Sequence, residues 1–140
     1  MNKITPVDTT TEIYIDGASR GNPGDSGIGI LFKNNEQYNF KKYIGIGTNN
    51  NAEYTALITA LEIALNSQLL KLIVHTDSML VANQINGSWK VKDPEIRILF
   101  SKAKKLIEKL EDFSITHIRR EFNSEADLLA NEAINEYFNN

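Results

Sequence analysis

The sequence predicts an α/β domain with a mixed five-stranded sheet, three antiparallel strands followed by parallel strands, and helices on both faces. Three observations carry this prediction. Segments with a two-residue hydrophobic period come first, and polar turns join them, which favours antiparallel hairpins. Segments with a helical period then separate the later strands, and strands that return through a helix lie parallel. The resulting order is three strands, a helix, a strand, two helices, a strand and a helix.

The first third of the chain is expected to form the antiparallel strands. Residues 1–10 are rich in Thr and other polar side chains, and we expect a loose N-terminal arm before a single domain spanning residues 1–140. The segment SRGNPGDSG, residues 19–27, has the composition of a turn. A second turn is expected at Asn34 and Asn35. The three strands are therefore predicted at residues 11–18, 28–33 and 37–47.

Helical and strand periods alternate through the rest of the chain. A stripe of Leu and Ala side chains predicts a helix over residues 51–66, with Asn49 or Asn50 as its cap. The run KLIVHT, residues 71–76, is apolar and β-branched, which is typical of a strand covered on both faces. Pro94 fits the first turn of a helix, where its missing N–H costs nothing. The remaining helices are predicted at 78–86, 93–110 and 124–138, and the last strand at 113–119.

Composition excludes several classes of protein. No apolar run approaches the roughly 20 residues of a membrane span, and the N-terminus lacks the apolar core of a secretory signal. With no cysteine, the chain has no disulfide, thiolate ligand or thiol nucleophile. We therefore expect a cytoplasmic protein that does not bind membranes, and we expect a monomer.

Four acidic residues stand where a carboxylate is unusual. Asp16 and Asp77 end predicted strands that are otherwise apolar. Glu53 and Asp127 share the apolar stripe near the start of their helices, so both point toward the sheet. Converging carboxylates repel one another unless a cation is present, and oxygen ligands select hard cations such as Mg²⁺ or Mn²⁺. The pattern indicates a metal site.

Each of these carboxylates also has a purely structural interpretation. Asp16 precedes a glycine and fits a turn, and Asp77 can cap the helix that follows it. Glu53 and Asp127 each stand three residues after an Asn or a Ser, as in a capping box. Any one of these caps is common. Four of them, each at a strand end or helix start, are a less economical explanation than a shared site.

Four short blocks of sequence carry the acidic residues. They are DGASRGNPG (16–24), TNNNAE (48–53), TDS (76–78) and NSEAD (123–127). Together, and in this order, they resemble the motifs of the type 1 RNase H family. The TDS triplet alone is uninformative, but four ordered blocks over residues 16–127 are specific. The resemblance implies an RNase H-like fold and an endoribonuclease that hydrolyses the RNA strand of RNA–DNA hybrids.

The resemblance also implies a cofactor and a substrate surface. The four carboxylates would hold two Mg²⁺ ions, with Mn²⁺ as an alternative, and Asp16 would bridge them; one ion would activate water and the other would stabilise the leaving 3′ oxygen. The family positions that contact the hybrid correspond to Ser19, Asn22, Asn49 and Asn50. Thr48 and Asn22 match positions that hold a DNA-strand phosphate. Contacts to backbone and sugar imply little sequence preference.

The sequence departs from the family pattern near its C-terminal end. The loop that carries a catalytic His in better-known members is shortened here to residues 119–122. His117 lies ten residues before Asp127, but we interpret it as a strand residue because the missing residues follow it. Arg120 is the predicted substitute, and Glu121 is a weaker candidate.

A second departure concerns the middle helices. Residues 87–94 leave no room for the basic handle that some members insert there. Trp89, with Lys90 and Lys92, either touches the DNA strand or packs beneath a loop. His75 alternates with Asp77 and either supports the metal site or is a satisfied structural His, which is the commoner case.

Net charge leaves the nature of the partner open. The formal charge is −3, whereas nucleic-acid binding favours a basic face. Two bound divalent cations would bring the total to about +1. Basic residues also gather locally, at Lys90, Lys92, Lys102, Lys104, Lys105, Arg119 and Arg120.

Two other functions compete with that of a ribonuclease. A catalytically inactive RNase H-like module, binding nucleic acid or protein, would lack at least one carboxylate, and all four are present. Another nuclease or phosphotransferase of the same fold would lack the GNPG and TNN blocks, and both are present.

Overall fold

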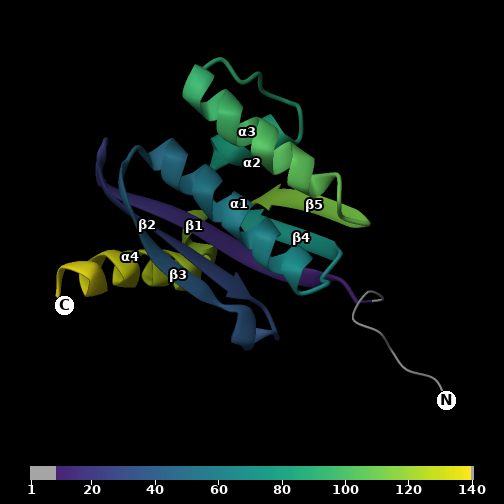
Figure 1. Ribbon diagram of the computed structural model, residues 1–140, viewed down its shortest axis with the longest axis horizontal. Helices are drawn as coiled ribbons and strands as arrows, with labels where there is room; N and C mark the ends of the chain where they lie inside the picture. Colours follow the sequence, from purple (N-terminus) through teal and green to yellow (C-terminus); the bar gives the residue numbers. More distant parts are fainter. Residues whose placement is uncertain (1–8, 140) are drawn as a thin grey trace.

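The computed structural model describes residues 9–139 and confirms the predicted order of elements (Figure 1). The strands are β1 (Thr11–Gly21), β2 (Gly24–Phe32), β3 (Phe40–Gly47), β4 (Lys71–Thr76) and β5 (Asp112–His117). The helices are α1 (Asn49–Asn66), α2 (Met79–Ile85), α3 (Pro94–Ile107) and α4 (Ser124–Phe138). The predicted arm, residues 1–10, lies outside the described residues apart from its last two. None of the described helices combines the length and apolar character that crossing a bilayer requires.

The strands form one mixed sheet in the order β3-β2-β1-β4-β5. β1, β2 and β3 pair antiparallel, whereas β4 is parallel to both β1 and β5, as the sequence predicts. α1 packs on β1 and β2, with α3 against α1, while α4 packs on the opposite side of β1, β2 and β3 (Figure 1). The core between α1 and the sheet contains the fully buried side chains of Ile13, Ile15, Leu57, Leu61 and Val74.

The sheet opens beside the middle of β1. β1 and β4 pair as far as Ile15 and Thr76, where β4 ends, while β1 continues along β2 to Gly21. In mixed and parallel sheets, ligands bind beyond the carboxyl ends of strands at such a point. The fold therefore places the residues that follow Ile15 and Thr76 where a ligand is expected to bind.

The predicted turn over residues 19–27 is wrong. β1 extends to Gly21 and β2 begins at Gly24, so only two residues connect them. The small residues of this segment serve packing as well as turning. A Cβ added to Gly27 would lie 2.5 Å from the carbonyl oxygen of Ala130, and one added to Gly29, two residues further along β2, would lie 2.2 Å from that of Ala126, so α4 approaches the sheet at backbone distance. Composition alone does not distinguish such a strand from a turn.

The connection between β2 and β3 is also longer than predicted. Instead of a turn at Asn34 and Asn35 alone, residues 33–39 contain a 3₁₀ turn at Glu36–Tyr38. The side chain of Asn39 accepts a hydrogen bond from the Phe32 N–H at 2.7 Å and closes this loop. Pairing resumes only where Phe40 faces Ile30.

β4 is not covered on both faces as predicted. Its buried residues alternate with half-buried ones, because α4 packs on β1, β2 and β3 rather than on β4. The predicted end of α3 is wrong as well, since the helix ends at Ile107 rather than at residue 110.

Candidate active site

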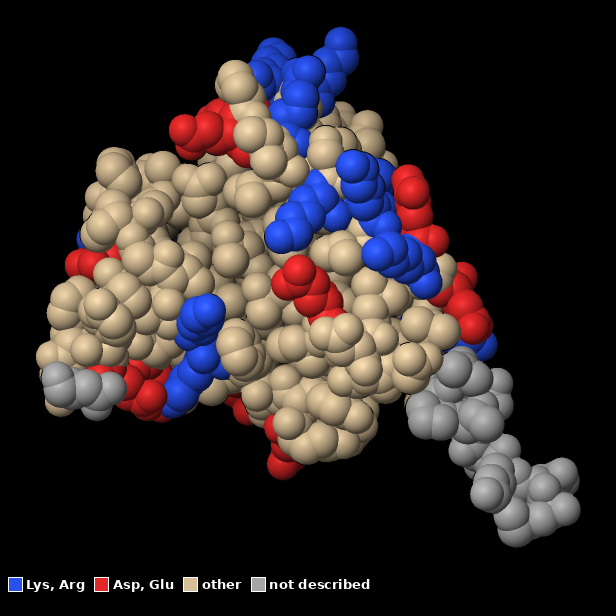
Figure 2. Space-filling view, in the orientation of Figure 1, with Lys and Arg blue, Asp and Glu red and all other residues tan. Residues whose placement is uncertain are grey.

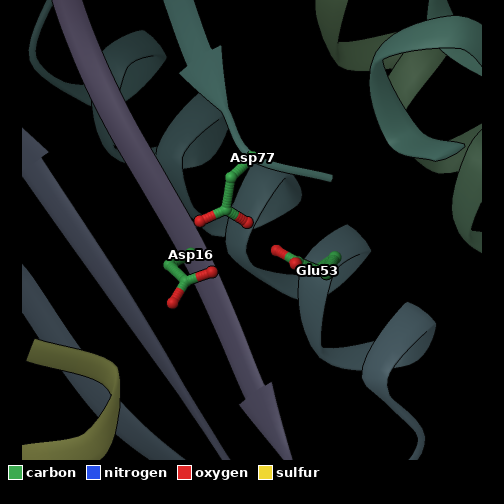
Figure 3. A group of neighbouring side chains, drawn as sticks. All are labelled: Asp16, Glu53 and Asp77. Carbon is green, nitrogen blue, oxygen red and sulfur yellow. The ribbon is translucent and has the colours of Figure 1, made fainter. Parts of the chain in front are cut away.

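The carboxylates of Asp16, Glu53 and Asp77 converge where the sheet opens. One oxygen of each lies within 4.8 Å of the other two (Figure 3). Asp16 projects from β1, Asp77 follows the last residue of β4, and Glu53 projects from the beginning of α1 (Figure 3). Asp127, in the first turn of α4, lines the same cavity without belonging to this close group. The structure therefore brings all four predicted carboxylates to one cavity of about 360 Å³.

The structural interpretations of the two strand-end carboxylates are wrong. Asp16 lies inside β1, paired with Gly29 of β2, and is not a turn residue. The cap of α2 is Ser78, whose hydroxyl accepts a hydrogen bond from the Val81 N–H at 3.1 Å. Neither Asp16 nor Asp77 therefore has a turn or capping role.

The helix carboxylates are not caps either. α1 is capped by Thr48, which forms a capping box with Asn51, so the predicted caps Asn49 and Asn50 are both wrong. The residue that precedes α4 is Asn123, and its side chain makes no cap hydrogen bond. Glu53 and Asp127 are thus free of the capping roles that their positions suggested.

Gly17 determines how Glu53 reaches the strand. The Gly17 N–H donates a hydrogen bond to Glu53 Oε1 at 2.9 Å. A Cβ on Gly17 would lie 2.2 Å from the carbonyl carbon of Ala52 and 2.4 Å from the Glu53 nitrogen. No side chain fits there, so the first turn of α1 rests directly on the backbone of β1.

We expect Gly17→Ala to lower the free energy of unfolding by about 2–3 kcal/mol or more, because α1 and β1 must separate to admit the methyl group. Urea denaturation measures the change. Gly47→Ala is the matched control, since a Cβ there would make only ordinary contacts at 3.7 Å. Equal unfolding midpoints for the two variants would contradict the packing argument.

Burial and mutual repulsion make the cluster electrostatically unfavourable when it is fully ionised. Burial, followed by the charges of Glu53 and Asp77, raises the pKa of Asp16 to about 10. Burial, followed by the charge of Asp77, raises the pKa of Glu53 to about 8, although the Gly17 N–H and Arg120 act in the opposite direction. A hard divalent cation would relieve this repulsion, and the donor set consists of the oxygen ligands it prefers. The residues present therefore fit a metal centre.

Two asparagines hold carboxylates of the cluster, and neither role was predicted. Asn123 Nδ2 donates to Asp77 Oδ2 at 3.2 Å and to the Ile15 carbonyl oxygen at 2.8 Å. Asn131 Nδ2 donates to the Asp127 carbonyl oxygen at 3.0 Å and to Asp127 Oδ1 at 3.3 Å. The spacing of Asp127 and Asn131, four residues apart on a helix, could have revealed the second pair.

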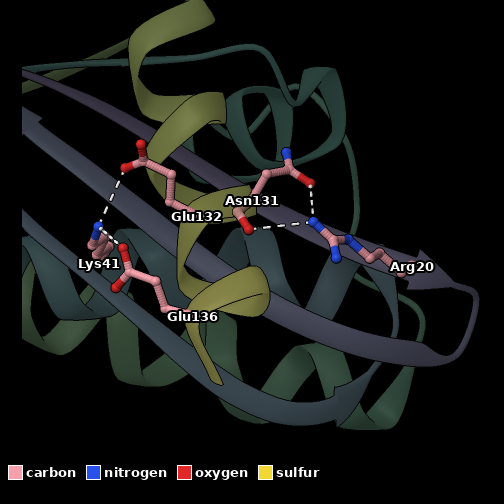
Figure 4. A network of polar contacts seen from close by, with 5 residues as sticks. All are labelled: Arg20, Lys41, Asn131, Glu132 and Glu136. Atoms are coloured by element: carbon pink, nitrogen blue, oxygen red, sulfur yellow. Dashed lines mark hydrogen bonds and ion pairs between the residues drawn. The ribbon is translucent and has the colours of Figure 1, made fainter. Parts of the chain in front are cut away.

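Contacts with β1 and β3 place α4 and hence Asp127. Arg20 Nη2, from β1, donates to the carbonyl oxygen and to Oδ1 of Asn131, both at 3.3 Å (Figure 4). Lys41 of β3 pairs with Glu132 at 3.2 Å and with Glu136 at 2.7 Å (Figure 4). These contacts join residues far apart in the sequence, so no local pattern reports them.

Three of the five predicted substrate-contact residues lie at or beside the carboxylate cavity, and the other two lie elsewhere. Ser19 and Asn49 line the cavity that holds the carboxylates. Asn22 lies beside them, because its Oδ1 accepts a hydrogen bond from the Asn49 N–H at 3.0 Å. Thr48 caps α1, and Asn50 lines a neighbouring groove.

The neighbouring groove contains Trp89, for which the sequence allows two interpretations. Trp89 lines the groove together with Asn50, Lys90 and Lys92. Trp89 is 45% exposed, so the interpretation that it packs beneath a loop is wrong. An exposed indole beside two lysines forms a surface next to the carboxylate cavity.

The shortened loop places Arg120 at the cavity. Arg120 begins a 3₁₀ turn, Arg120–Phe122, and lines the cavity with the four carboxylates. His117 belongs to β5, as predicted; its side chain is exposed and does not line that cavity. Glu121 instead forms an ion pair with Arg119 at 3.0 Å on the surface.

His75 does not contact Asp77. Its Nε2 lies 2.9 Å from Glu12 Oε1, and its ring stacks on Tyr14 with a centroid separation of 4.5 Å. These partners lie on the part of β1 that precedes the carboxylates. The contacts therefore favour the structural interpretation of His75, but its hydrogen bonding is not fully satisfied, because the buried Nδ1 has no partner within residues 9–139.

Several of the basic residues lie close together on the surface, although the formal net charge is −3. In Figure 2, Lys and Arg side chains lie over α3 and around its ends, whereas much of the opposite side of this view has no charged side chain. A groove along α3 includes Lys92, Arg97, Lys102 and Lys105. The surface along α3 is therefore locally basic, although the net charge of the whole chain is negative.

Comparisons with known proteins agree with this arrangement. The sequence model of the family described as "Reverse transcriptase-like" matches residues 14–133. Ribonuclease HI of Halobacterium salinarum is 41% identical over 126 residues, covering 88% of this chain and 63% of that protein. Ribonuclease H of Chromobacterium violaceum is 35% identical over 140 residues, covering 88% of this chain and 93% of that protein.

A solved structure extends the comparison to three dimensions. The crystal structure of LC11-RNase H1 in complex with RNA/DNA hybrid matches with a TM-score of 0.84 and 40% identity, covering 91% of this chain and 99% of that one. The relatives differ in length, because this chain spans 63% of the halobacterial protein and 35% of a mycobacterial relative described as bifunctional.

Proposed function

Since the chain belongs to the ribonuclease H branch of the reverse transcriptase-like family, we propose that it hydrolyses the RNA strand of RNA–DNA hybrids with little sequence preference. The observation that carries the proposal is the close group of Asp16, Glu53 and Asp77 in a cavity that also contains Arg120. A relative of similar fold that holds a hybrid supports the choice of substrate.

Asp16, Glu53, Asp77 and Asp127 are the proposed ligands of two Mg²⁺ ions, with Mn²⁺ as the alternative. When bound, the ions would activate the attacking water and stabilise the leaving 3′ oxygen. Asp16 is the carboxylate proposed to serve both ions, because Glu53, Asp77 and Asp127 all raise its pKa and it therefore lies near each of the other three.

The other residues of the cavity would bind and orient the nucleic acid. Ser19, Asn22, Asn49 and Asn50 carry short polar side chains that suit 2′-hydroxyls and sugars in a shallow minor groove. Thr48 and Asn22 are the proposed contacts for a DNA-strand phosphate. The basic face over α3 would attract the backbone without reading bases. One copy of the domain supplies all these groups, so a monomer is sufficient.

A cleavage assay with one labelled strand tests the proposal. We expect the RNA strand of an RNA–DNA hybrid to be cut with Mg²⁺ or Mn²⁺ and to stay intact with a chelator. Double-stranded DNA and double-stranded RNA are assayed separately for comparison. Hybrid binding without cleavage would indicate an inactive module, and equal cleavage of all substrates would indicate another nuclease of this fold.

The shortened loop gives a second prediction. Arg120→Ala is expected to lower kcat by about a hundredfold. Among the described residues, Arg120 is the positively charged side chain that lines the carboxylate cavity. Arg119→Ala is the matched control, since Arg119 pairs with Glu121 outside that cavity. His117→Ala should retain most activity. A hundredfold loss in His117→Ala, or full activity in Arg120→Ala, would contradict this assignment.

A further inference from the structure

We propose that Asn123 is a positioning residue of the metal centre, which sets the carboxylate of Asp77 against the backbone beside Asp16. The inference rests on the proposed function, since it concerns how the same four carboxylates are held. It assigns Asn123 a role beyond its position in the NSEAD block.

One side-chain amide reaches two parts of the cluster. Asn123 Nδ2 donates to the Ile15 carbonyl oxygen at 2.8 Å and to Asp77 Oδ2 at 3.2 Å. Ile15 immediately precedes Asp16 in β1. The two hydrogen bonds therefore fix the distance between the strand that carries Asp16 and the residue that follows β4.

The Asn123 amide lies where the pairing between β1 and β4 ends. Ile15 and Thr76 are the last paired residues of β1 and β4. Beyond them the Thr76 carbonyl oxygen accepts from the Ile118 N–H at 2.8 Å, on the β5 side. The Ile15 carbonyl oxygen accepts from Asn123 instead. Asn123 thus replaces a strand contact at the point where Asp16 and Asp77 must be held near each other.

Asn123 also anchors the helix that carries Asp127. It is the residue before α4, and its carbonyl oxygen accepts the Asp127 N–H at 3.1 Å. Contacts from this one residue consequently reach the main chain beside Asp16, the side chain of Asp77 and the main chain of Asp127. Among the described residues, no other side chain donates to both β1 and a carboxylate of the cluster.

The chemistry of the site requires the nitrogen end of an amide. Both acceptors lie on the Nδ2 side, and an amide nitrogen has two hydrogens to donate. Within residues 9–139, no donor reaches the buried Oδ1 of Asn123. An apolar side chain would avoid leaving this oxygen unpaired but would leave Asp77 and Ile15 without a donor. The contacts therefore favour a role directed at the carboxylate.

Asn123 is 1% exposed, so it cannot touch the nucleic acid and must act through Asp77. Groups that hydrogen-bond a metal ligand typically change metal affinity by about ten- to hundredfold when they are removed. A residue that only stabilised the fold would lower the melting temperature without changing the affinity of the folded protein.

The test is calorimetric titration of the full chain with Mn²⁺ alone, without nucleic acid, for the wild type, Asn123→Ala and Asn86→Ala. Asn86 is the matched control, because its Nδ2 donates to the Ile115 carbonyl oxygen at 3.2 Å and its described hydrogen bonds include no carboxylate. We expect Asn123→Ala to weaken Mn²⁺ binding about ten- to hundredfold and Asn86→Ala to leave it unchanged. In the cleavage assay, kcat should fall while KM for the hybrid stays constant.

The outcomes separate this role from the proposed function. If the wild type neither binds Mn²⁺ nor cleaves the hybrid, the proposed function fails. If it does both and Asn123→Ala binds Mn²⁺ like the wild type, only the role of Asn123 fails. Asn123→Gln, which displaces the amide by one methylene, should also weaken binding and serves if the Ala variant does not fold. If neither variant folds by circular dichroism, Asn123 belongs to the fold alone and the inference is overturned.

Discussion

Asp16→Asn is expected to reduce hybrid cleavage in Mg²⁺ by about a thousandfold or more, while the protein stays folded. Asp16 is the carboxylate that every other member of the cluster affects, since Glu53, Asp77 and Asp127 all raise its pKa. An amide keeps the shape of the side chain but removes the negative charge that would hold two cations together. Cleavage rates with a labelled hybrid measure the loss.

The same variant should be more stable than the wild type without metal, because the wild type must either keep a repelled charge on Asp16 or bind a proton there at a cost, and asparagine avoids both. Asp93→Asn is the matched control. Asp93 caps α3 through a hydrogen bond from the Glu95 N–H at 2.8 Å, and asparagine caps equally well. We expect the control to keep wild-type activity and stability. Mg²⁺-dependent cleavage by Asp16→Asn at the wild-type rate would refute the role of this carboxylate.

The stability of the metal-free protein should depend on pH in the direction opposite to that of an ordinary paired carboxylate. The fold raises the pKa of Asp16 from its ordinary value of 3.8 to about 10, and that of Glu53 from 4.5 to about 8. Between these limits the folded state binds more protons than the unfolded state. The free energy of unfolding therefore falls as pH rises through this window, and the stability is fully present below about pH 4.

The expected size of this fall is a few kcal/mol, since a tenfold change in proton affinity corresponds to about 1.4 kcal/mol and the two groups titrate together. Urea denaturation at several pH values, with and without Mg²⁺, measures it. Mg²⁺ should remove most of the slope, because the ion takes the place of the protons. Asp16→Asn provides the comparison that subtracts all other titrating groups. A wild-type curve parallel to that of Asp16→Asn would contradict the mutual repulsion within the cluster.

The sequence predicted the fold and the convergence of the carboxylates through periodicity. The direction of the Glu53 side chain could be predicted because Glu53 lies four residues before Leu57. Residues four apart lie on the same face of a helix, whatever the rest of the fold. The order of strands and helices was predicted for the same reason. Local pattern was thus sufficient for the order of the elements and for the direction of this carboxylate.

Long-range contacts account for most of the misses. The glycines and serines between Asp16 and Ile28 have the composition of a turn, but they pair as strands and α4 packs directly against Gly27, contacts that the local sequence does not reveal. The cap of α1 is a local miss, because Thr48 forms a capping box with Asn51 only three residues later. Arg20 and Asn123 reach partners more than a hundred residues away, so neighbouring sequence contains no signal for them.

The backbone approaches at Gly17 and Gly29 imply a stiff site. α1 presses on β1 at Gly17 from one side of the sheet, and α4 presses on β2 at Gly29, the partner of Asp16, from the other. Main chain against main chain cannot yield as a flexible side chain would. The acidic groups therefore cannot drift apart to lower their repulsion, and the ligand geometry exists before any ion arrives. Little reorganisation should accompany ion capture, and exchange of one ion for another should leave the polypeptide backbone where it was.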